Sequence, residues 1–351
     1  MIRVGIIGAG AISHSHIAAY QKLEDVKIAA VCDINNNRAS SVASTYKIEK
    51  TYDRHTDLVN DPDIDAVSVV TWNNSHMQIS IDALNAGKHV LCEKPVAMNA
   101  EEAEKMVEAA RSSGCILLPG FCTRYEDGVR LLKRYIDADE LGHIYYAKAA
   151  FLRRYGSPGG WFADRKLSGG GPVIDLGVHI LDLARFLMGA PMAVTVTAEV
   201  YNHIGSRSEI EGVNRYLSVD FNDGSDVEES AVALIRFDNG LTVHFETSWL
   251  LNLKEDVFQL EVFGSKAGAR LYPKIELYGD KFNHLVNSNP QYSNNENLPN
   301  YDFDMEIRHF IRCIRGEEKC ICTPEDGLEM MRIIDAVYES ARSHREILIR
   351  R

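Results

Sequence analysis

Two patterns of apolar and polar positions divide the chain. In its first part, short β-branched apolar runs alternate with segments whose apolar residues recur at helical spacing. We expect strands at residues 3–7, 26–32, 65–71, 89–93 and 115–118, helices at 14–23, 38–46, 75–85 and 99–113, and a polar helix or turn at 53–60. Ser75 and Asn99 are expected to cap two of these helices, which Gly87 and Gly114 end. This alternation predicts a doubly wound parallel sheet with helices on both faces.

The rest of the chain is patterned differently. Alternating, β-branched runs predict strands at 144–153, 192–200, 227–237, 241–249 and 257–263, and Asp238-Asn239-Gly240 between two of them predicts a hairpin. Helices are expected at 126–136, 173–188, 302–314 and 324–344, and the polar stretch 283–300 is expected to be a loop. The pattern predicts an α+β domain with a large, mostly antiparallel sheet. We therefore divide the chain into domains at 1–122 and 123–351.

A glycine turn directly follows the first strand. Gly8 allows a sharp turn, and Gly10 has no Cβ, so a pyrophosphate can approach the backbone N–H groups at the helix start. Ser13 stands where the dinucleotide-binding fingerprint has Gly or Ala, but it is still small. The second strand ends in Asp33, about 20 residues past the turn. This context favours a dinucleotide site over an ordinary strand–turn–helix.

The residues around Asp33 indicate which dinucleotide is bound. The Asp33 carboxylate is suited to accept hydrogen bonds from the adenosine ribose and would repel a 2′-phosphate. Ile34 offers no cation, and Arg38 is expected to open the next helix. NAD is therefore favoured over NADP.

Composition and charge exclude several classes of protein. The chain of 351 residues is long enough for roughly two domains, and its 45% hydrophobic and 25% charged residues are typical of a soluble globular protein. A formal net charge of −12 argues against a nucleic-acid or anionic-membrane partner, and no long apolar run predicts a membrane span. The chain begins directly with a strand, which leaves no room for a signal peptide.

The cysteines point to a reducing compartment and not to a metal. All seven are scattered along the chain, which suits the cytoplasm. Cys313, Cys320 and Cys322 lie close in sequence, but their spacing matches no common zinc pattern and no His pair accompanies them. We therefore expect no metal.

Two further sequences fall where ligands of doubly wound sheets bind, beyond the carboxyl ends of the strands. One is the stretch 71–76, and the other is Glu93-Lys94-Pro95, directly after a strand. Considered alone, a lysine between Glu and Pro indicates a surface residue with a salt partner. Its position at this edge makes Lys94 a candidate for chemistry.

The second domain contains another candidate stretch, in which glycine-rich residues 155–172 lead into the helix at 173–188. Asp175 and His179 are four residues apart, so they share a helix face and can act on one substrate. Asp182 is placed to orient the His179 ring. The alternative is that His179 is a hydrogen-bonded core histidine and Asp175 a first-turn cap.

Together these residues resemble the glucose–fructose oxidoreductase/inositol dehydrogenase (Gfo/Idh/MocA) family over essentially the whole chain. The resemblance rests on four stretches: the glycine turn 8–12 with His16, Glu93-Lys94-Pro95, Gly120-Phe121 with Arg124-Tyr125, and residues 170–179. Ser13 departs from the family pattern, as does Trp72, which stands where the family often has proline and could alter how the nicotinamide end of the cofactor is held.

The resemblance implies roles for individual residues. Lys94 would be the catalytic lysine, His179 the proton acceptor and Asp175 a ligand for substrate hydroxyls. The expected cofactor site comprises Gly8, Gly10, Ala11, Ile12, Asp33 and Ile34, to which the resemblance adds Thr71, Asn73, His76, Glu93, Lys94 and Trp161. It also implies substrate contacts from Arg124, Tyr155 and Trp161, and a cis Lys94–Pro95 bond is a further hypothesis.

The function expected from these features is reversible oxidation of a secondary alcohol on a polyol or sugar. A neutral His179 would take the hydroxyl proton and cationic Lys94 would stabilise the developing alkoxide, while the nicotinamide accepts the hydride. Two alternatives stay open: an NAD-dependent glycoside hydrolase on the same fold, and a non-catalytic NAD-binding sensor. The sequence does not identify the sugar or inositol, and the family resemblance implies a homodimer or homotetramer.

Overall fold

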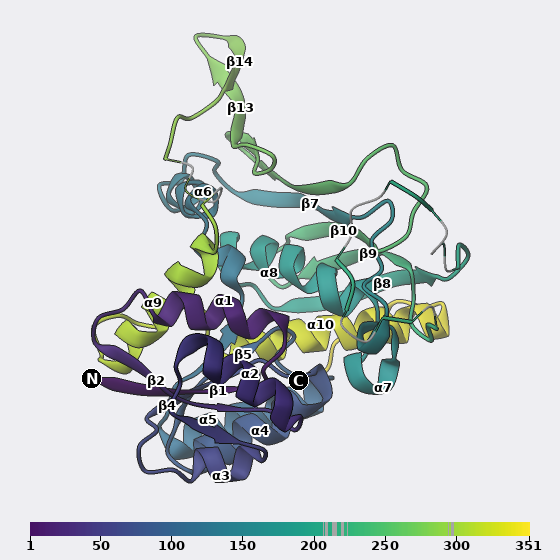
Figure 1. Ribbon diagram of the computed structural model, residues 1–351. Coiled ribbons are helices and arrows are strands. Elements are labelled where there is room, and N and C mark those ends of the chain that lie inside the picture. The colour runs from purple at the N-terminus through teal and green to yellow at the C-terminus, as the bar shows by residue number, and fades with distance from the viewer. Residues whose placement is uncertain are drawn as a thin grey trace. The chain divides into compact units, whose positions relative to one another are not determined.

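The computed structural model describes residues 1–205, 207, 210–212, 216–218, 221–222, 224–293, 295 and 298–351. The chain divides into two compact units, one formed by Met1–Tyr125 with Glu296–Met331 and the other by Glu126–Asn295 with Arg332–Arg351 (Figure 1). The first unit therefore includes a C-terminal segment that the predicted linear division at 122/123 does not assign to it. Among the described residues, no helix is long and apolar enough to cross a membrane.

The first unit contains a six-stranded parallel sheet with the strand order β3-β2-β1-β4-β5-β6. Its strands are β1 (Ile2–Ile7), β2 (Val26–Cys32), β3 (Lys50–Tyr52), β4 (Ala66–Val69), β5 (His89–Glu93) and β6 (Leu117–Gly120). The chain runs outward from β1 to β3 and then returns to place β4 on the other side of β1. This reversal confirms the doubly wound fold and creates the crevice in which such sheets bind ligands. The short strand β3 was not predicted.

The helices of this sheet are α1 (Ala11–Tyr20), α2 (Asn36–Tyr46), α3 (His55–Val59), α4 (Asn73–Asn85) and α5 (Ala100–Ser113). The Asn99 side chain accepts the N–H of Glu102, and Gly114 ends α5 in the left-handed conformation, as predicted. The prediction that Ser75 caps α4 is wrong, because the helix begins earlier, at Asn73. The Ser75 hydroxyl lies inside its first turn and donates to Thr71 Oγ1 and the Trp72 carbonyl instead.

Residues 298–331 add the helix α9 (Tyr301–Ile314) and the start of α10 (Pro324–Ser343) to the first unit. Ile307, Phe310 and Ile311 of α9 lie in the same hydrophobic cluster as Val4 and Ile6 of β1. The core of the first unit is therefore completed by residues from near the end of the chain.

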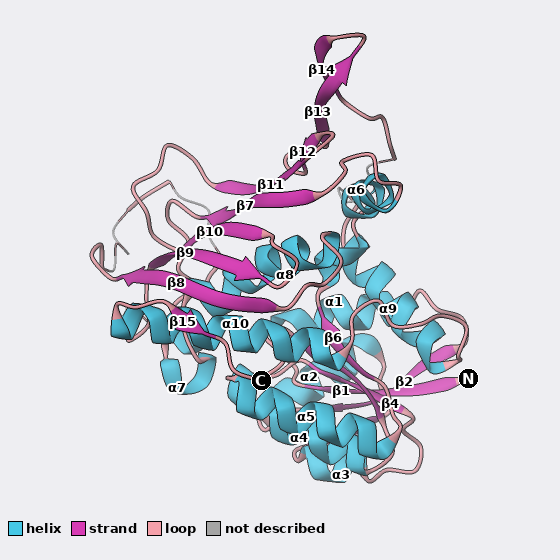
Figure 2. Cartoon of the chain, turned by 180° about the vertical axis from the view of Figure 1, so that it is seen from behind, coloured by secondary structure: helices cyan, strands magenta, loops and turns pink. Residues whose placement is uncertain are grey.

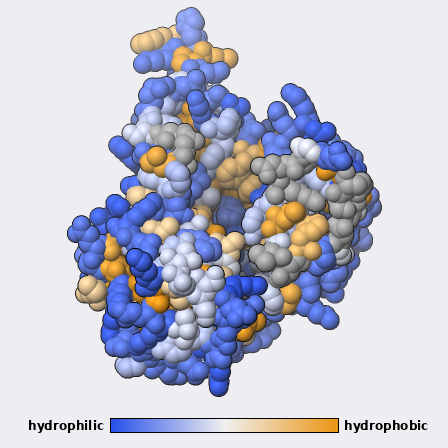
Figure 3. All heavy atoms as spheres, viewed as in Figure 1, coloured by the Kyte–Doolittle hydropathy of each residue, from blue (hydrophilic) through white to orange (hydrophobic). Residues whose placement is uncertain are grey.

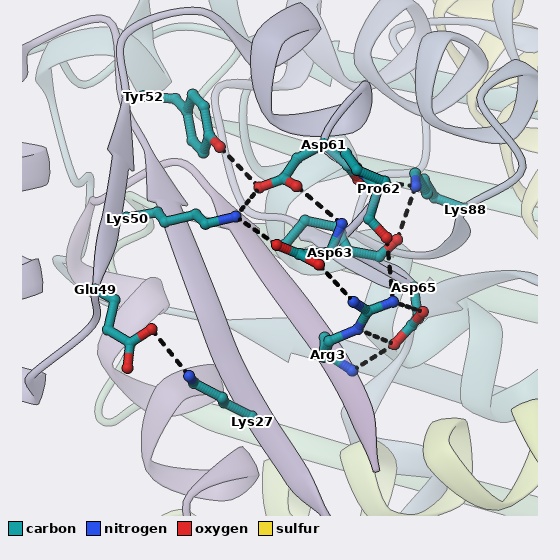
Figure 4. A network of polar contacts seen from close by, with 11 residues as sticks. Arg3, Lys27, Glu49, Lys50, Tyr52, Asp61, Pro62, Asp63, Asp65 and Lys88 are labelled. Atoms are coloured by element: carbon teal, nitrogen blue, oxygen red, sulfur yellow. Dashed lines mark hydrogen bonds and ion pairs between the residues drawn. The ribbon is translucent and has the colours of Figure 1, made fainter.

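A charged network secures the edge of this sheet where β1 begins (Figure 4). The Asp61 carboxylate accepts hydrogen bonds from Lys50 Nζ at 2.7 Å, the Tyr52 hydroxyl at 2.8 Å and the Asp63 N–H at 2.8 Å. Arg3 binds Asp65 through both its backbone and its guanidinium. The first residues of β1 and β3 are thereby bonded to the loop that precedes β4.

The second unit contains a nine-stranded sheet with the order β14-β13-β12-β11-β7-β10-β9-β8-β15 (Figure 2). Its strands are β7 (Ile144–Leu152), β8 (Ala193–Tyr201), β9 (Ser230–Phe237), β10 (Thr242–Ser248), β11 (Val257–Gly264), β12 (Gly268–Arg270), β13 (Glu276–Lys281), β14 (His284–Ser288) and β15 (Ile347–Leu348). All its pairs are antiparallel except β7 with β10, and β9 and β10 form the predicted hairpin around Asn239-Gly240. The predicted mostly antiparallel sheet is confirmed.

The prediction of a loop at 283–300 is wrong over residues 284–288, which form β14 and pair with β13. Both strands are polar or exposed on both faces, so they lack the alternation that indicates a strand. Phe282 and Leu285 project from this hairpin, whose hydrophobic tip stands out in Figure 3. Residues 294, 296 and 297 of the same predicted loop lie outside the described residues.

The second unit also contains the helices α6 (Asp127–Asp137), α7 (Arg165–Ser168) and α8 (Val178–Leu187). The predicted helix at 173–188 begins with a π-helical turn at Val173–Gly177, which continues directly into α8. Such turns are rare and occur often at functional sites. Leu176, Ile180, Leu183, Ala184 and Leu187 of this segment are all buried, as predicted.

Candidate active site

The turn after β1 requires glycine at its first position. Gly8 has φ +103°, a conformation that side chains rarely adopt, and a Cβ there would lie 2.4 Å from the Val70 carbonyl oxygen. Its N–H donates to the Cys32 carbonyl at 2.8 Å. Gly8 therefore turns the chain against the end of β4.

The helix that follows is open at its N-terminus. Gly10 is the N-cap of α1, no side chain caps the helix, and no atom lies within 4 Å of where a Gly10 Cβ would be. Uncapped N–H groups beside open space fit a pyrophosphate. Ala11 is exposed and Ile12 half-buried at this end, while Ser13 is buried and its hydroxyl donates to the Gly10 carbonyl at 2.6 Å. Ser13 thus fits the turn without a rearrangement.

Asp33 stands at the end of β2 and holds the same turn from the other side. One of its carboxylate oxygens accepts the Ala9 N–H and the other the Asn35 N–H, both at 2.8 Å. These bonds fix the carboxylate beside the glycine turn, where a ribose would follow the pyrophosphate. Ile34 is 83% exposed and brings no charge to this place.

His76 links the ends of β4 and β5. Its Nδ1 lies 2.8 Å from the Pro95 carbonyl oxygen and its Nε2 3.1 Å from that of Thr71. Burial lowers the pKa of His76, and a neutral ring donates to one of these two carbonyls. Asn73 at the start of α4 is also buried. His76 therefore joins the segment after β4 to the Glu93-Lys94-Pro95 turn.

The turn after β5 is held by Glu93. Glu93 Oε1 lies 2.9 Å from His16 Nε2, and Oε2 accepts the Lys94 N–H at 3.1 Å. Burial opposes ionisation of Glu93, but His16 and Lys94 together hold its pKa below the usual value. The Lys94–Pro95 bond is cis, which confirms that hypothesis, and Lys94 itself is partly exposed.

In the second unit, Asp175 lies in the π-helical turn and His179 in the first turn of α8. Asp175 is buried and its Oδ2 accepts the Trp249 indole N–H at 3.0 Å. No sequence pattern indicated Trp249, which is 74 residues away from Asp175 on the chain. His179 is only partly buried, whereas Asp182 is fully buried. Trp249 therefore fixes the orientation of the Asp175 carboxylate.

The start of this segment is anchored by Glu228, a second residue that the sequence did not indicate. Glu228 Oε1 accepts the N–H groups of Gly171 and Val173 and the Tyr338 hydroxyl. Burial raises the pKa of Glu228. A Cβ on Gly171 would lie 2.2 Å from the Glu228 carbonyl oxygen, and one on Gly170 would lie 1.9 Å from the Tyr338 hydroxyl. These glycines are thus required for close packing and do not indicate flexibility.

Tyr155 and Trp161 also belong to the second unit. Tyr155 packs in a hydrophobic cluster with Leu176 and Trp249. Tyr155 and Trp249 also line a cavity of about 150 Å³. Trp161 is partly exposed, and its ring centroid lies 3.9 Å from that of Phe162. Phe162 packs against the same cluster as Tyr155, and that cluster includes Leu176, the residue after Asp175.

Arg124 has a different environment from the one the substrate prediction implies. Its guanidinium is buried in the first unit, donates to the Ile321 carbonyl at 2.5 Å and pairs with Asp326 at 3.3 Å. It also lies over the Phe121 ring. These contacts favour a structural role that fastens the segment before α10 to the end of the Rossmann sheet.

Comparison with known proteins places these features in a family. A model described as "Oxidoreductase family, NAD-binding Rossmann fold" (GFO_IDH_MocA) matches residues 2–121, and the GFO/IDH/MocA C-terminal domain matches 129–270. The chain is 32% identical to D-glucoside 3-dehydrogenase of Escherichia coli (strain K12) over 345 residues, which covers 97% of this chain and 96% of that protein. It is 27% identical to scyllo-inositol 2-dehydrogenase (NAD(+)) of Bacillus subtilis (strain 168), covering 97% and 94%.

The fold has close counterparts among solved structures. Levoglucosan dehydrogenase in complex with NADH superposes with a TM-score of 0.87 at 23% identity, covering 100% of this chain and 99% of that chain. At that level of identity the match concerns the fold.

Proposed function

The chain belongs to the Gfo/Idh/MocA family of NAD-binding oxidoreductases, and from that premise we propose that it reversibly oxidises a secondary alcohol of a sugar or cyclic polyol. The observation that carries the proposal is the Glu93-Lys94-Pro95 turn. Glu93 fixes the backbone of Lys94 at the carboxyl end of β5, the edge of the sheet at which the uncapped N-terminus of α1 also lies. A cation held at that edge is suited to stabilise an alkoxide beside a bound dinucleotide.

The first unit supplies the cofactor site in this proposal. The N–H groups at the start of α1 bind the pyrophosphate of NAD, and Asp33 accepts hydrogen bonds from the adenosine ribose. Ala11, Ile12 and Ile34 surround these groups, and Thr71, Asn73, His76 and Glu93 line the nicotinamide end. When bound, the nicotinamide supplies hydride chemistry.

Lys94 and His179 handle the charge and the proton of the reacting hydroxyl. The Lys94 ammonium stabilises the developing alkoxide, and a neutral His179 imidazole accepts the hydroxyl proton, a role typically worth about 10²–10⁴-fold in rate. Asp175, oriented by Trp249, accepts hydrogen bonds from a neighbouring hydroxyl of the substrate. Tyr155 and Trp161 provide aromatic surface for the apolar faces of a sugar ring.

The relatives define which substrates to try first. Their names cover a D-glucoside 3-dehydrogenase, inositol 2-dehydrogenases and a levoglucosan dehydrogenase. All these substrates are rings with adjacent hydroxyl groups. The Asp175 carboxylate, the His179 imidazole and the Lys94 ammonium are suited to bind such hydroxyl groups together. We propose the same substrate class for this chain.

The test is a substrate screen with NAD and NADP in parallel, followed by absorbance of the reduced cofactor. D-glucosides, myo- and scyllo-inositol, levoglucosan and simple aldoses form the panel, and glycerol and ethanol serve as acyclic controls. We expect reduction of NAD with at least one ring substrate and a lower kcat/KM with NADP. Release of free sugar from a glycoside without net NADH would instead identify a hydrolase, and tight NAD binding with no turnover across the panel would indicate a sensor.

We also propose that the enzyme is a cytoplasmic homo-oligomer. All seven cysteines are free, as expected in a reducing compartment. By the strand register, the sheet face that carries the exposed Val232 also carries Tyr146 and Phe263, whose rings stack, and this apolar surface is suited to a second copy. Light scattering of the purified protein tests the assembly, and a monomer at micromolar concentration would refute it.

A further inference from the structure

One buried acid has no use in the chemistry described so far. Glu306 lies on α9 between Phe303 and Phe310, on the face that packs into the core of the first unit. Its side chain is fully buried, and neither carboxylate oxygen accepts a hydrogen bond from any donor among the described residues. An isolated buried carboxylate is very costly, so such a group takes up a proton or a partner.

The nearest polar groups form a continuous hydrogen-bonded chain. The Tyr20 hydroxyl lies 2.9 Å from Ser68 Oγ, which lies 3.2 Å from His16 Nδ1. His16 Nε2 lies 2.9 Å from Glu93 Oε1. If Tyr20 donates to Ser68 and Ser68 to Nδ1, a neutral His16 donates its Nε2–H to an ionised Glu93. This arrangement satisfies every member of the chain and leaves Glu306 outside it.

Glu306 lies beside the His16–Glu93 pair. A ring nitrogen of His16, a carboxylate oxygen of Glu93 and a carboxylate oxygen of Glu306 all lie within 4.8 Å of one another. Two ionised carboxylates so close in a buried site repel each other, so one of them must carry a proton. Glu93 already has two N–H donors that stabilise its charge, and Glu306 has none.

The surroundings of Glu306 oppose its ionisation from every side. The charged or titratable groups that face it come from α1, β5, the turn before α6 and α9 itself, and they are His16, Tyr20, Glu93, Tyr125 and Asp302. Burial first, and then the charges of Glu93 and Asp302, raise the pKa of Glu306 well above its usual value. Both the geometry and these effects favour a proton on Glu306 over one on Glu93.

We propose that Glu306 is a positioning residue for Lys94: as a neutral carboxylic acid it donates a hydrogen bond to Glu93, which in turn holds the N–H of Lys94. The carboxylate of Glu93 then has three donors, from His16, Lys94 and Glu306, and is fixed in one orientation. Any loss of the third donor frees Glu93 to rotate and displaces the lysine turn. Displacement of a catalytic group by 1 Å can lower the rate by about 10²-fold.

A bound divalent cation is the competing explanation of the same three residues. The 2.9 Å contact between His16 Nε2 and Glu93 Oε1 is an ordinary hydrogen-bond distance, and His16 Nδ1 has its own partner in Ser68. A proton on Glu306 accounts for the geometry without displacing either contact. Metal analysis of the purified protein nevertheless forms part of the test.

The experiment compares Glu306→Gln with Glu306→Leu. The Gln amide keeps the shape and a donor, whereas Leu keeps the bulk and removes the donor. Arg308→Ala, an exposed position on the same helix, is the matched control. Each variant is measured for thermal stability, NAD affinity, kcat and KM, and for the infrared band of a protonated carboxyl group. The role of Lys94 in this proposal rests on the proposed function. The infrared band reports only whether Glu306 is protonated, so it does not depend on that function.

We expect wild-type protein to show the protonated-carboxyl band near neutral pH and both Glu306 variants to lack it. The kcat of Glu306→Leu should fall about 10- to 100-fold with little change in NAD affinity, and that of Glu306→Gln should stay within about threefold of wild type. In a Glu93→Gln background, Glu306→Leu should have little further effect on kcat, because the residue acts through Glu93.

Several results would overturn the proposal. They are a wild-type spectrum without the band, a folded Gln variant as slow as the Leu variant, full additivity with Glu93→Gln, or one equivalent of a divalent metal that the Gln variant loses. If the wild-type enzyme reduces no cofactor with any substrate, the proposed function fails, and the infrared and metal measurements still decide the state of Glu306.

Discussion

The two glycines of the nucleotide turn should fail in opposite ways when replaced by alanine. Gly8 has φ +103°, and a Cβ there meets the Val70 carbonyl oxygen at 2.4 Å. Gly10 has φ −79° and ψ −173°, which any residue adopts, and its Cβ would meet no atom within 4 Å. The first substitution therefore strains the fold, and the second only fills the space in front of α1.

The backbone conformation alone makes Gly8→Ala cost about 1–3 kcal/mol, and the contact with Val70 adds to this. Gly10→Ala should change the free energy of unfolding by no more than about 0.5 kcal/mol, as an unstrained surface substitution does. The new methyl group would, however, stand where the pyrophosphate approaches the backbone. We expect at least about a tenfold loss of NAD affinity, which corresponds to about 1.4 kcal/mol.

Urea unfolding without cofactor and calorimetric titration with NAD measure the two quantities separately. Gly114→Ala is a useful third variant, since its φ is +68° at the end of α5 but no nucleotide role is assigned to it. It should lose stability and keep NAD affinity among the folded molecules. If Gly10→Ala binds NAD as tightly as wild type, the assignment of the pyrophosphate to this turn is wrong, and a fully stable Gly8→Ala would refute the steric argument.

Four further changes test other parts of the structure. Lys94→Ala should lower kcat by about 10²–10³-fold and leave NAD affinity within a few-fold, as judged by turnover and titration. His179→Ala should slow turnover and abolish the fall in kcat at low pH that protonation of the wild-type base causes, which a pH–rate profile would reveal. Trp249→Phe removes a hydrogen bond to the buried Asp175 carboxylate. It should raise the activation free energy, measured from kcat/KM, by about 1.5–3 kcal/mol. Asp61, whose pKa is lowered to about 2, chiefly by Lys50, stabilises the fold above its unfolded pKa of 3.8. The deficit of Asp61→Asn at pH 7 should therefore shrink between about pH 4 and 2 in urea unfolding, and a deficit independent of pH would contradict the ion-pair account.

Local signals made the first unit predictable. The glycine turn, the strand before it and Asp33 lie within a short stretch, and their roles depend on backbone geometry that neighbouring residues set. Asn99 and Gly114 were predicted at the ends of α5 for the same reason. The Ser75 prediction failed because two polar residues precede Ser75, and the helix had already begun at the first of them.

Long-range partners were not predictable. Trp249 and Asp175 are 74 residues apart, and nothing in either local sequence indicates that an indole N–H will meet that carboxylate. Glu228 reaches the Gly171 N–H across 57 residues. The sequence indicated candidates for the chemistry, whereas the residues that orient those candidates became apparent only in the structure. The roles assigned to Lys94, Asp175 and His179 stay predictions until variants are measured.

The placement of α9 connects these observations. A nucleotide-binding sheet needs cover on both faces, and here part of that cover comes from residues 301–314, which follow eight of the nine strands of the other sheet in sequence. Ile307 and Phe310 supply the apolar contacts expected of such a helix. Glu306, directly before Ile307 on the same helix, replaces what would be another apolar contact by a carboxyl group beside Glu93. Because burial of an unpaired acid destabilises the fold, a residue of this kind at a site that packing alone would fill with Leu or Met points to a functional requirement at the lysine turn.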